Sequence, residues 1–154
     1  MPPTWIFCSL HLAGAAVYGL SVLFFAVLLS LAGTDDLRRA RHRRFLSWGP
    51  VLGLSMGALI AGGIGLYYQQ NGAFFWGTET HEEQMILLKH LSFLVLWVSH
   101  FHLEIWTQDP LRKLNPENNP EDASAWERTC RRVGWQLRLN AIAFVLIGAL
   151  AFWT

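Results

Sequence analysis

Titratable side chains lie inside the hydrophobic stretches of this 154-residue chain, where a membrane protein rarely places them. Neutral imidazole binds transition metals such as haem iron, and a buried lysine can accept a proton. A charge at membrane depth costs about 2.5–3.5 kcal/mol, so each such residue is a functional candidate by default. The candidates are His11, Lys89, His90, His100, Glu104 and Arg138.

The stretches that hold these residues are each long enough to cross a membrane. They cover about 5–31, 46–68, 84–106 and 133–153, and a helix needs about 20 residues to span the hydrocarbon core. None shows the polar face, repeating every 3.6 residues, of a soluble bundle. The sequence therefore predicts an all-α integral membrane protein, a bundle of four transmembrane helices that forms one domain over 1–154.

The positions of the basic residues predict the orientation. Ten of the 12 Lys and Arg residues lie in the connections 33–45 and 109–132, and the connection 69–83 has none. Because basic loops stay in the cytoplasm, both termini are expected on the outer, periplasmic side of a bacterial inner membrane. Lipid is then the surrounding partner, and no nucleic-acid partner is expected.

The second cytoplasmic connection is the longest segment outside the predicted spans. Asp109-Pro110 is expected to end the third helix. The part from Asp122 to Arg132 has acidic residues first and basic residues last, which suits a short interfacial helix. A solvated linker suits the same residues, and both interpretations stay open.

Depth sorts the polar residues into two layers. Each residue of the outer layer lies five or six residues from the outer end of its helix, about 9 Å deep at 1.5 Å per residue. Lys89 and His100 are three turns apart on one face, and His100 can hydrogen-bond to Glu104 at i,i+4. The outer layer is His11, Lys89 and His90; the inner layer is His100, His102, Glu104 and Arg138.

Histidines outside the predicted layers, and one near the interface, are expected to be solvated. His42 lies among arginines, His81 lies in the outer connection, and His102 is close to the cytoplasmic interface. For His11 and His100, a packing role and ligation of haem b iron both remain open, because a bundle places haem between histidines on facing helices.

The second stretch carries a small residue at every fourth position: Gly49, Gly53, Gly57, Ala61 and Gly65. Small residues let two helix backbones approach closely in a membrane. The same stripe could also form a flat wall for a planar macrocycle. The sequence does not decide between these two interpretations.

Three segments match the pattern of a known family. They are 7–20, which contains His11; 87–102, which contains Lys89, His90 and His100; and 137–140, which contains Arg138 and Asn140. In these segments the chain resembles the HemJ-type protoporphyrinogen oxidases and the related CopD-like membrane proteins, although that family usually has Trp at the position of Tyr18.

The resemblance implies an oxidation of protoporphyrinogen IX, with electrons leaving through haem b to a quinone-type acceptor. His11 and Lys89 would be the functional pair, His11 as iron ligand and Lys89 as proton acceptor or propionate partner. His100, Glu104 and Arg138 would anchor propionates or release protons. The second axial ligand (His90, His100 or Met56) and the number of haems, one or two, stay open.

Two other classes of function remain open, so whether the chain is an enzyme is undecided. One is a haem-binding or structural subunit of a larger respiratory or photosynthetic membrane complex, with other membrane subunits as partners. The other is copper handling, which is disfavoured because copper(I) prefers sulfur ligands. The sulfur-bearing residues Met1, Met56, Met85, Cys8 and Cys130 are not clustered in the sequence.

Overall fold

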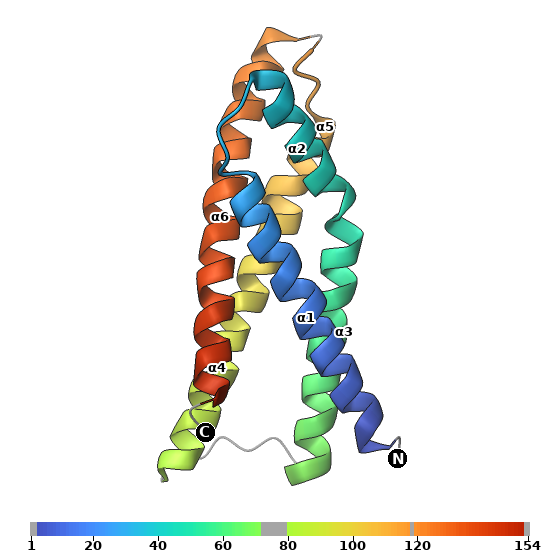
Figure 1. Cartoon of the computed structure of the whole chain (residues 1–154), viewed down its shortest axis with the longest axis vertical. Helices are drawn as coiled ribbons and strands as arrows, with labels where there is room; N and C mark the ends of the chain where they lie inside the picture. The colour runs from blue at the N-terminus through green and yellow to red at the C-terminus, as the bar shows by residue number, and fades with distance from the viewer. Residues whose placement is uncertain (1–2, 72–79, 118, 153–154) are drawn as a thin grey trace.

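The computed structural model describes residues 3–71, 80–117 and 119–152, and all secondary structure in these ranges is helical (Figure 1). One six-residue segment, η1, is a π-helical turn that continues α4. The elements are α1 (Thr4–Leu28), α2 (Asp35–Ser47), α3 (Gly49–Asn71), α4 (His81–His102), η1 (Leu103–Gln108), α5 (Asp109–Lys113) and α6 (Pro120–Phe152).

Three described helices are long and apolar enough to cross a membrane. They are α1, the Gly49–Gln69 part of α3, and the continuous segment Glu83–Lys113 that runs through α4, η1 and α5. This confirms an all-helical architecture compatible with a multi-pass membrane protein. The segment 133–153 is helical as far as residue 152, as the second half of α6. Its role as a fourth span, and the orientation of the chain, stay predictions.

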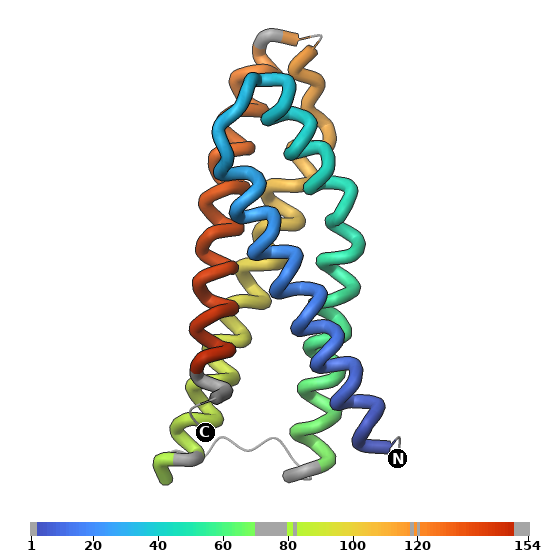
Figure 2. The backbone as a smooth tube through the Cα atoms, in the orientation of Figure 1, coloured from blue at the N-terminus to red at the C-terminus, as the bar shows by residue number. Residues whose placement is uncertain are grey.

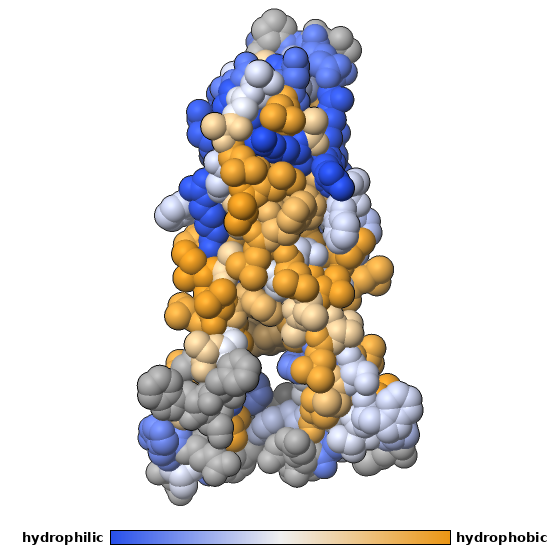
Figure 3. Space-filling model, in the orientation of Figure 1, coloured by the Kyte–Doolittle hydropathy of each residue, from blue (hydrophilic) through white to orange (hydrophobic). Residues whose placement is uncertain are grey.

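The long helices form two pairs, α1 with α3 and α4 with α6, and α1 also contacts α6. Figure 2 shows the pairs close together at the end that holds α2 and α5, and splayed apart at the other end. The start of α1 and the end of α6 both lie at the splayed end. Figure 3 shows an opening between the two pairs there and an apolar belt above it.

Glycines bring the backbones of α1 and α3 into direct contact. A Cβ added to Gly14 would lie 2.5 Å from the backbone nitrogen of Leu59, and one added to Gly62 would lie 2.4 Å from that of His11. Both distances are far shorter than a carbon atom tolerates. The pair therefore packs backbone against backbone, as small residues allow within a membrane.

The apolar core lies where all four long helices approach one another. Tyr18, Val22 and Phe25 of α1 are almost completely buried. They belong to one cluster with buried side chains from α2, α3, α4, η1 and α6, which include Phe45, Leu52, Met56, Leu96, Leu103 and Leu137. Because α1 packs against α6 as well as against α3, its buried face joins the two pairs.

The connection predicted as a loop at 33–45 is largely the helix α2. The Thr34 hydroxyl caps it by accepting a hydrogen bond from the Leu37 backbone, acidic residues occupy its first turn, and Arg44 lies in its last turn. The helix buries Phe45 and His42 against its neighbours. The prediction of a solvated His42 was wrong, because this packing leaves the residue only 7% exposed.

The second connection, predicted at 109–132, is also mostly helical. Pro110 does not end the preceding helix, which continues to Lys113, because the proline lies in the first turn of α5 where its missing N–H is tolerated. The segment 120–132 is helical, as one of the two interpretations proposed. It is continuous with the apolar half of α6 in a single helix of 33 residues.

The glycine contact leads to a prediction for two alanine variants of α3. Gly62→Ala should destabilise the protein by about 1–3 kcal/mol, because its new methyl group overlaps the backbone of α1. Gly57→Ala is the matched control, since a Cβ there meets nothing within 4 Å. It should be neutral or stabilise by up to about 1 kcal/mol. Unfolding measured in detergent micelles tests both; equal effects of the two variants would contradict the predicted contact.

Candidate functional site

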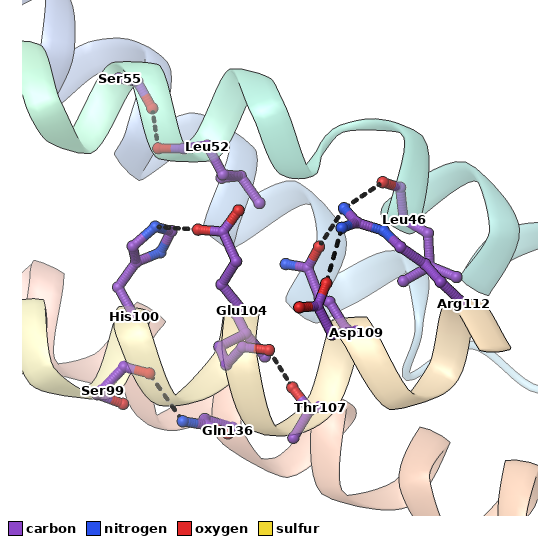
Figure 4. A network of polar contacts seen from close by, with 12 residues as sticks. Leu46, Leu52, Ser55, Ser99, His100, Glu104, Thr107, Asp109, Arg112 and Gln136 are labelled. Carbon is purple, nitrogen blue, oxygen red and sulfur yellow. Dashed lines mark hydrogen bonds and ion pairs between the residues drawn. The ribbon is translucent and has the colours of Figure 1, made fainter.

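A buried polar cluster lies at the junction of α4 and η1 (Figure 4). His100, with its side chain only 4% exposed, points its Nε2 at Glu104, whose Oε2 is 3.6 Å away. The two residues face one another as predicted, at a distance longer than a hydrogen bond. The ring of His100 also meets the ring of Tyr18 edge to face, with centroids 5.3 Å apart.

Neither ring nitrogen of His100 has a hydrogen-bond partner within the described ranges, and the Tyr18 hydroxyl has none either. A buried polar group without a partner costs about 1–3 kcal/mol. Native proteins keep few such groups, and each needs an explanation such as a functional role or a bound group. His100 and Tyr18 are therefore the clearest functional candidates of the inner layer.

The π-helical turn determines which side chains accompany His100. A π turn is wider than an α turn and is frequent at functional sites. In η1 it leaves Leu103, Thr107 and Gln108 buried, and the Thr107 hydroxyl donates to the Leu103 carbonyl. Glu104 lies in the same turn and reaches the α3 side of the cluster.

Glycines of α3 make room for these polar side chains. A Cβ on Gly53 would lie 3.6 Å from Glu104 Oε2, and one on Gly49 would lie 2.5 Å from an Arg112 nitrogen. Arg112 donates to the Gln108 side chain at 3.3 Å and to the Leu46 carbonyl at 3.4 Å. These contacts hold the end of the α4–α5 segment against the junction of α2 and α3.

Hydrogen bonds also join α4 to α6 beside His100. The Ser99 hydroxyl donates to the Asn140 side-chain oxygen, and Gln136 Nε2 donates to the Ser99 carbonyl at 2.8 Å. Asn140 is 1% exposed. The Ser99–Asn140 bond fixes the rotation of α4 about its axis. It thereby directs the next residue, His100, toward α3 and α1.

The outer layer is built around His11 of α1. Its Nδ1 lies 2.9 Å from the Leu59 carbonyl oxygen of α3. A carbonyl only accepts hydrogen bonds, so Nδ1 is the donor in this contact, and in the neutral tautomer that makes this bond, Nε2 holds the lone pair. Gly63 lies beside the ring, since a Cβ there would be 3.1 Å from Nδ1.

The other predicted residues of the outer layer lie on α4. His90 meets the ring of Tyr67 of α3 edge to face, with centroids 5.0 Å apart. Lys89 is half-buried. Tyr67 is one turn beyond Gly63 on α3, which places His90 and His11 near the same level of that helix.

The inner layer is smaller than predicted. His102 is exposed, as expected, and stacks on Trp106 with ring centroids 6.3 Å apart. Arg138 is exposed, and its Nε donates to the hydroxyl of Ser30, two residues past the end of α1, at 3.1 Å. It lies at the level of His100, because Asn140 and Gln136 of α6 bond to Ser99, but at this level α6 turns Leu137 and Asn140 toward the core and Arg138 outward.

The small residues in the stripe on α3 have two kinds of surroundings, packed contacts and open space. Gly49 and Gly53 contact polar side chains of the α4–α5 segment, and Gly65 packs against Phe7. A Cβ on Gly57 meets nothing within 4 Å, and Ala61 is exposed. Part of the stripe serves packing, therefore, and part leaves an open surface.

Sequence reasoning missed Tyr18 as a site residue. Tyr18 lies seven residues after His11, so two helical turns put both on one face of α1, about 10 Å apart along the axis. That spacing was a readable signal. The deep burial of Gln108, at 0% exposure, had no such signal, because it depends on the π turn.

His42 of α2 lies outside the polar layers and has a shifted pKa. In α2, burial lowers the pKa of His42, whose Nδ1 bonds to the Arg38 carbonyl at 2.9 Å, so the ring is neutral near pH 7.

Among the described residues, no group of three or more His, Cys, Asp or Glu could hold a metal ion. Haem needs only one or two protein ligands, so this finding does not bear on it.

Comparisons with known proteins identify no relative. No family model, no curated protein and no solved structure matches the chain. The resemblance to HemJ-type oxidases therefore stays a prediction from the quoted residues, and any function has to come from the site itself.

The polar link between α4 and α6 leads to a prediction. Asn140→Ala should destabilise the protein by about 1–3 kcal/mol, because it leaves the Ser99 hydroxyl without its acceptor. Ser99→Ala and the double variant complete a cycle in which the two single effects should not add. Unfolding in detergent micelles measures all three; strict additivity would contradict a direct bond between the side chains.

Proposed function

We propose that the chain is a haem b-binding redox protein of the bacterial inner membrane, similar in activity to HemJ-type protoporphyrinogen IX oxidases. The observation that carries the proposal is the orientation of His11. Its Nδ1–H bonds to the Leu59 carbonyl, which leaves Nε2 as the free basic nitrogen inside an apolar helix pair.

Ligand histidines of metal sites commonly donate their second ring N–H to a backbone carbonyl or a carboxylate. This bond sets the tautomer and increases the basicity of the nitrogen that binds the metal. For His11 the acceptor belongs to the neighbouring helix, so the orientation of the ring depends on the α1–α3 contact. That makes His11 the first candidate for the iron ligand.

The surroundings of α3 also suit a planar macrocycle. Gly53 faces Glu104 of the α4–η1 segment, and Gly57 is one turn away on the same face of α3. A Cβ on Gly57 would meet open space. The face of α3 toward α4 therefore offers room next to two half-buried or buried histidines, His90 and His100, either of which could be the second ligand.

When bound, haem b would accept and donate single electrons, which a bundle of these side chains cannot do alone. Complete oxidation of protoporphyrinogen IX to protoporphyrin IX releases six electrons and six protons, which would reduce three quinone molecules to three quinols. The chain's own residues would handle protons. Lys89 would accept one at Nζ, and Glu104 would accept one at Oε2 and share it with His100 Nε2, which faces it.

Haem binding is tested first with His11→Ala. The purified wild-type protein should show a b-type band in the reduced-minus-oxidised spectrum and about one haem per chain or more by pyridine haemochrome. His11→Ala should lose most of that haem, and His102→Ala, an exposed histidine stacked on Trp106, should keep it. Unchanged spectrum and stoichiometry in His11→Ala would refute the proposed ligand.

Oxidase activity is tested separately with Lys89→Ala. This variant should bind haem normally and lose at least about tenfold in the rate of protoporphyrin formation, since general acid–base groups contribute about 10²–10⁴-fold. Lys113→Ala is the matched control, because Lys113 is exposed on α5. Haem binding without oxidase activity in the wild-type protein would favour the haem-binding subunit of a larger complex, which should then co-purify with partners.

A further inference from the structure

A basic cavity lies outside the polar layers. It is formed between α2, α6 and the end of α1 that is predicted to be cytoplasmic. It has a volume of about 390 Å³. Its lining includes guanidinium groups, indole rings and Leu29, which follows α1. The lining residues that matter here are Arg38, Arg39, Arg131, Arg138, Trp126 and Trp135.

The cavity carries an excess of positive charge. Four arginines line it, against the two acidic residues Asp35 and Glu127. Arg38 pairs with Asp35, and this ion pair holds the pKa of the Asp35 carboxyl below its usual range. His42, which also lines the cavity, adds no charge near pH 7 because burial lowers its pKa.

Three of the arginines have guanidinium nitrogens available to a ligand. Neither Arg39 nor Arg131 forms an ion pair with any residue that the structure describes. Arg138 uses its Nε to bond Ser30, just past the end of α1, which leaves both of its terminal nitrogens for a ligand. Guanidinium groups bind phosphate oxygens in a bidentate geometry, so the cavity matches a phosphate group better than a cation.

The cavity lies at the boundary between apolar and polar surface. Leu29 follows the last residue of α1, and Arg138 belongs to the predicted fourth apolar stretch. Below this level both helices expose large apolar side chains, which include Phe24 (53%) on α1 and Ile142 (58%) on α6. Figure 3 shows the strongly hydrophilic surface beginning above the apolar belt. Trp135, 63% exposed, is a residue type typical of membrane interfaces.

We infer that this cavity binds the phosphate headgroup of an anionic phospholipid in the cytoplasmic leaflet. Basic clusters next to membrane helices recognise such headgroups, and here the acyl chains would continue along the exposed apolar surfaces of α1 and α6. A soluble phosphate ester has the same headgroup chemistry but no apolar part. The inference does not depend on haem binding or on oxidase activity.

Lipid binding to the purified full chain tests the inference. Radiolabelled dioleoylphosphatidylglycerol in detergent micelles should bind at about one molecule per chain, and dioleoylphosphatidylcholine should bind at least about tenfold more weakly. Glycerol 3-phosphate at millimolar concentration should not displace the bound lipid. Equal binding of the two lipids, or displacement by glycerol 3-phosphate, would overturn the proposed lipid site; the second result would identify a soluble phosphate site.

A variant assigns the binding to the cavity. The double change Arg39→Gln and Arg131→Gln should weaken phosphatidylglycerol binding by roughly tenfold or more, since each basic residue contributes about fivefold near a membrane surface. The matched control is Arg43→Gln with Arg44→Gln, which removes two arginines of α2 that do not line the cavity. Equal losses in both variants would show attraction by net charge alone and would overturn the site. The comparison of the two lipids needs no variant.

Discussion

The backbone contact between α1 and α3 is the constraint on which the rest of the structure depends. Gly14 and Gly62 allow it, because any side chain at either position would overlap the opposite helix. The same contact brings the Leu59 carbonyl to the ring of His11. Both helices are apolar enough to cross a membrane, and there close van der Waals packing, rather than the hydrophobic effect, would hold the pair together. The glycines therefore support both the fold and the best ligand candidate.

Both polar layers include a side chain of α1. His11 bonds to α3 in the outer layer, and Tyr18, two turns later, meets His100 of α4 in the inner layer. The apolar core begins at the inner layer and continues toward α2, and there it joins α1 to the other long helices. The contacts of both layers therefore involve side chains of one helix. The basic cavity lies beyond the inner layer, at the end of the same helix.

The apolar stretches identified the helices well but not what each residue faces. Length and missing charge predicted α1, α3 and α4, and the structure confirms them as long apolar helices. The sequence did not show which way the side chains of His42 and Arg138 point, for opposite reasons. His42 is buried because α2 is a capped helix that packs against its neighbours, and Arg138 points away from the core because Leu137 and Asn140 occupy it. Adjacent residues of a helix point about 100° apart. The pattern of apolar residues alone does not specify which of them faces the core.

The sequence by itself determined the apolar helices, the clustering of Lys and Arg in two of the connections, and the positions of His11, Lys89 and His100 along their helices. These properties depend on composition and on 1.5 Å per residue along a helix. Only the tertiary structure decided which side chains meet. It joined His11 to a carbonyl of α3, left His100 buried without a hydrogen-bond partner among the described residues, and moved Arg138 into the basic cavity. The physical reason is that helix rotation and close backbone approach depend on contacts between segments far apart in the sequence.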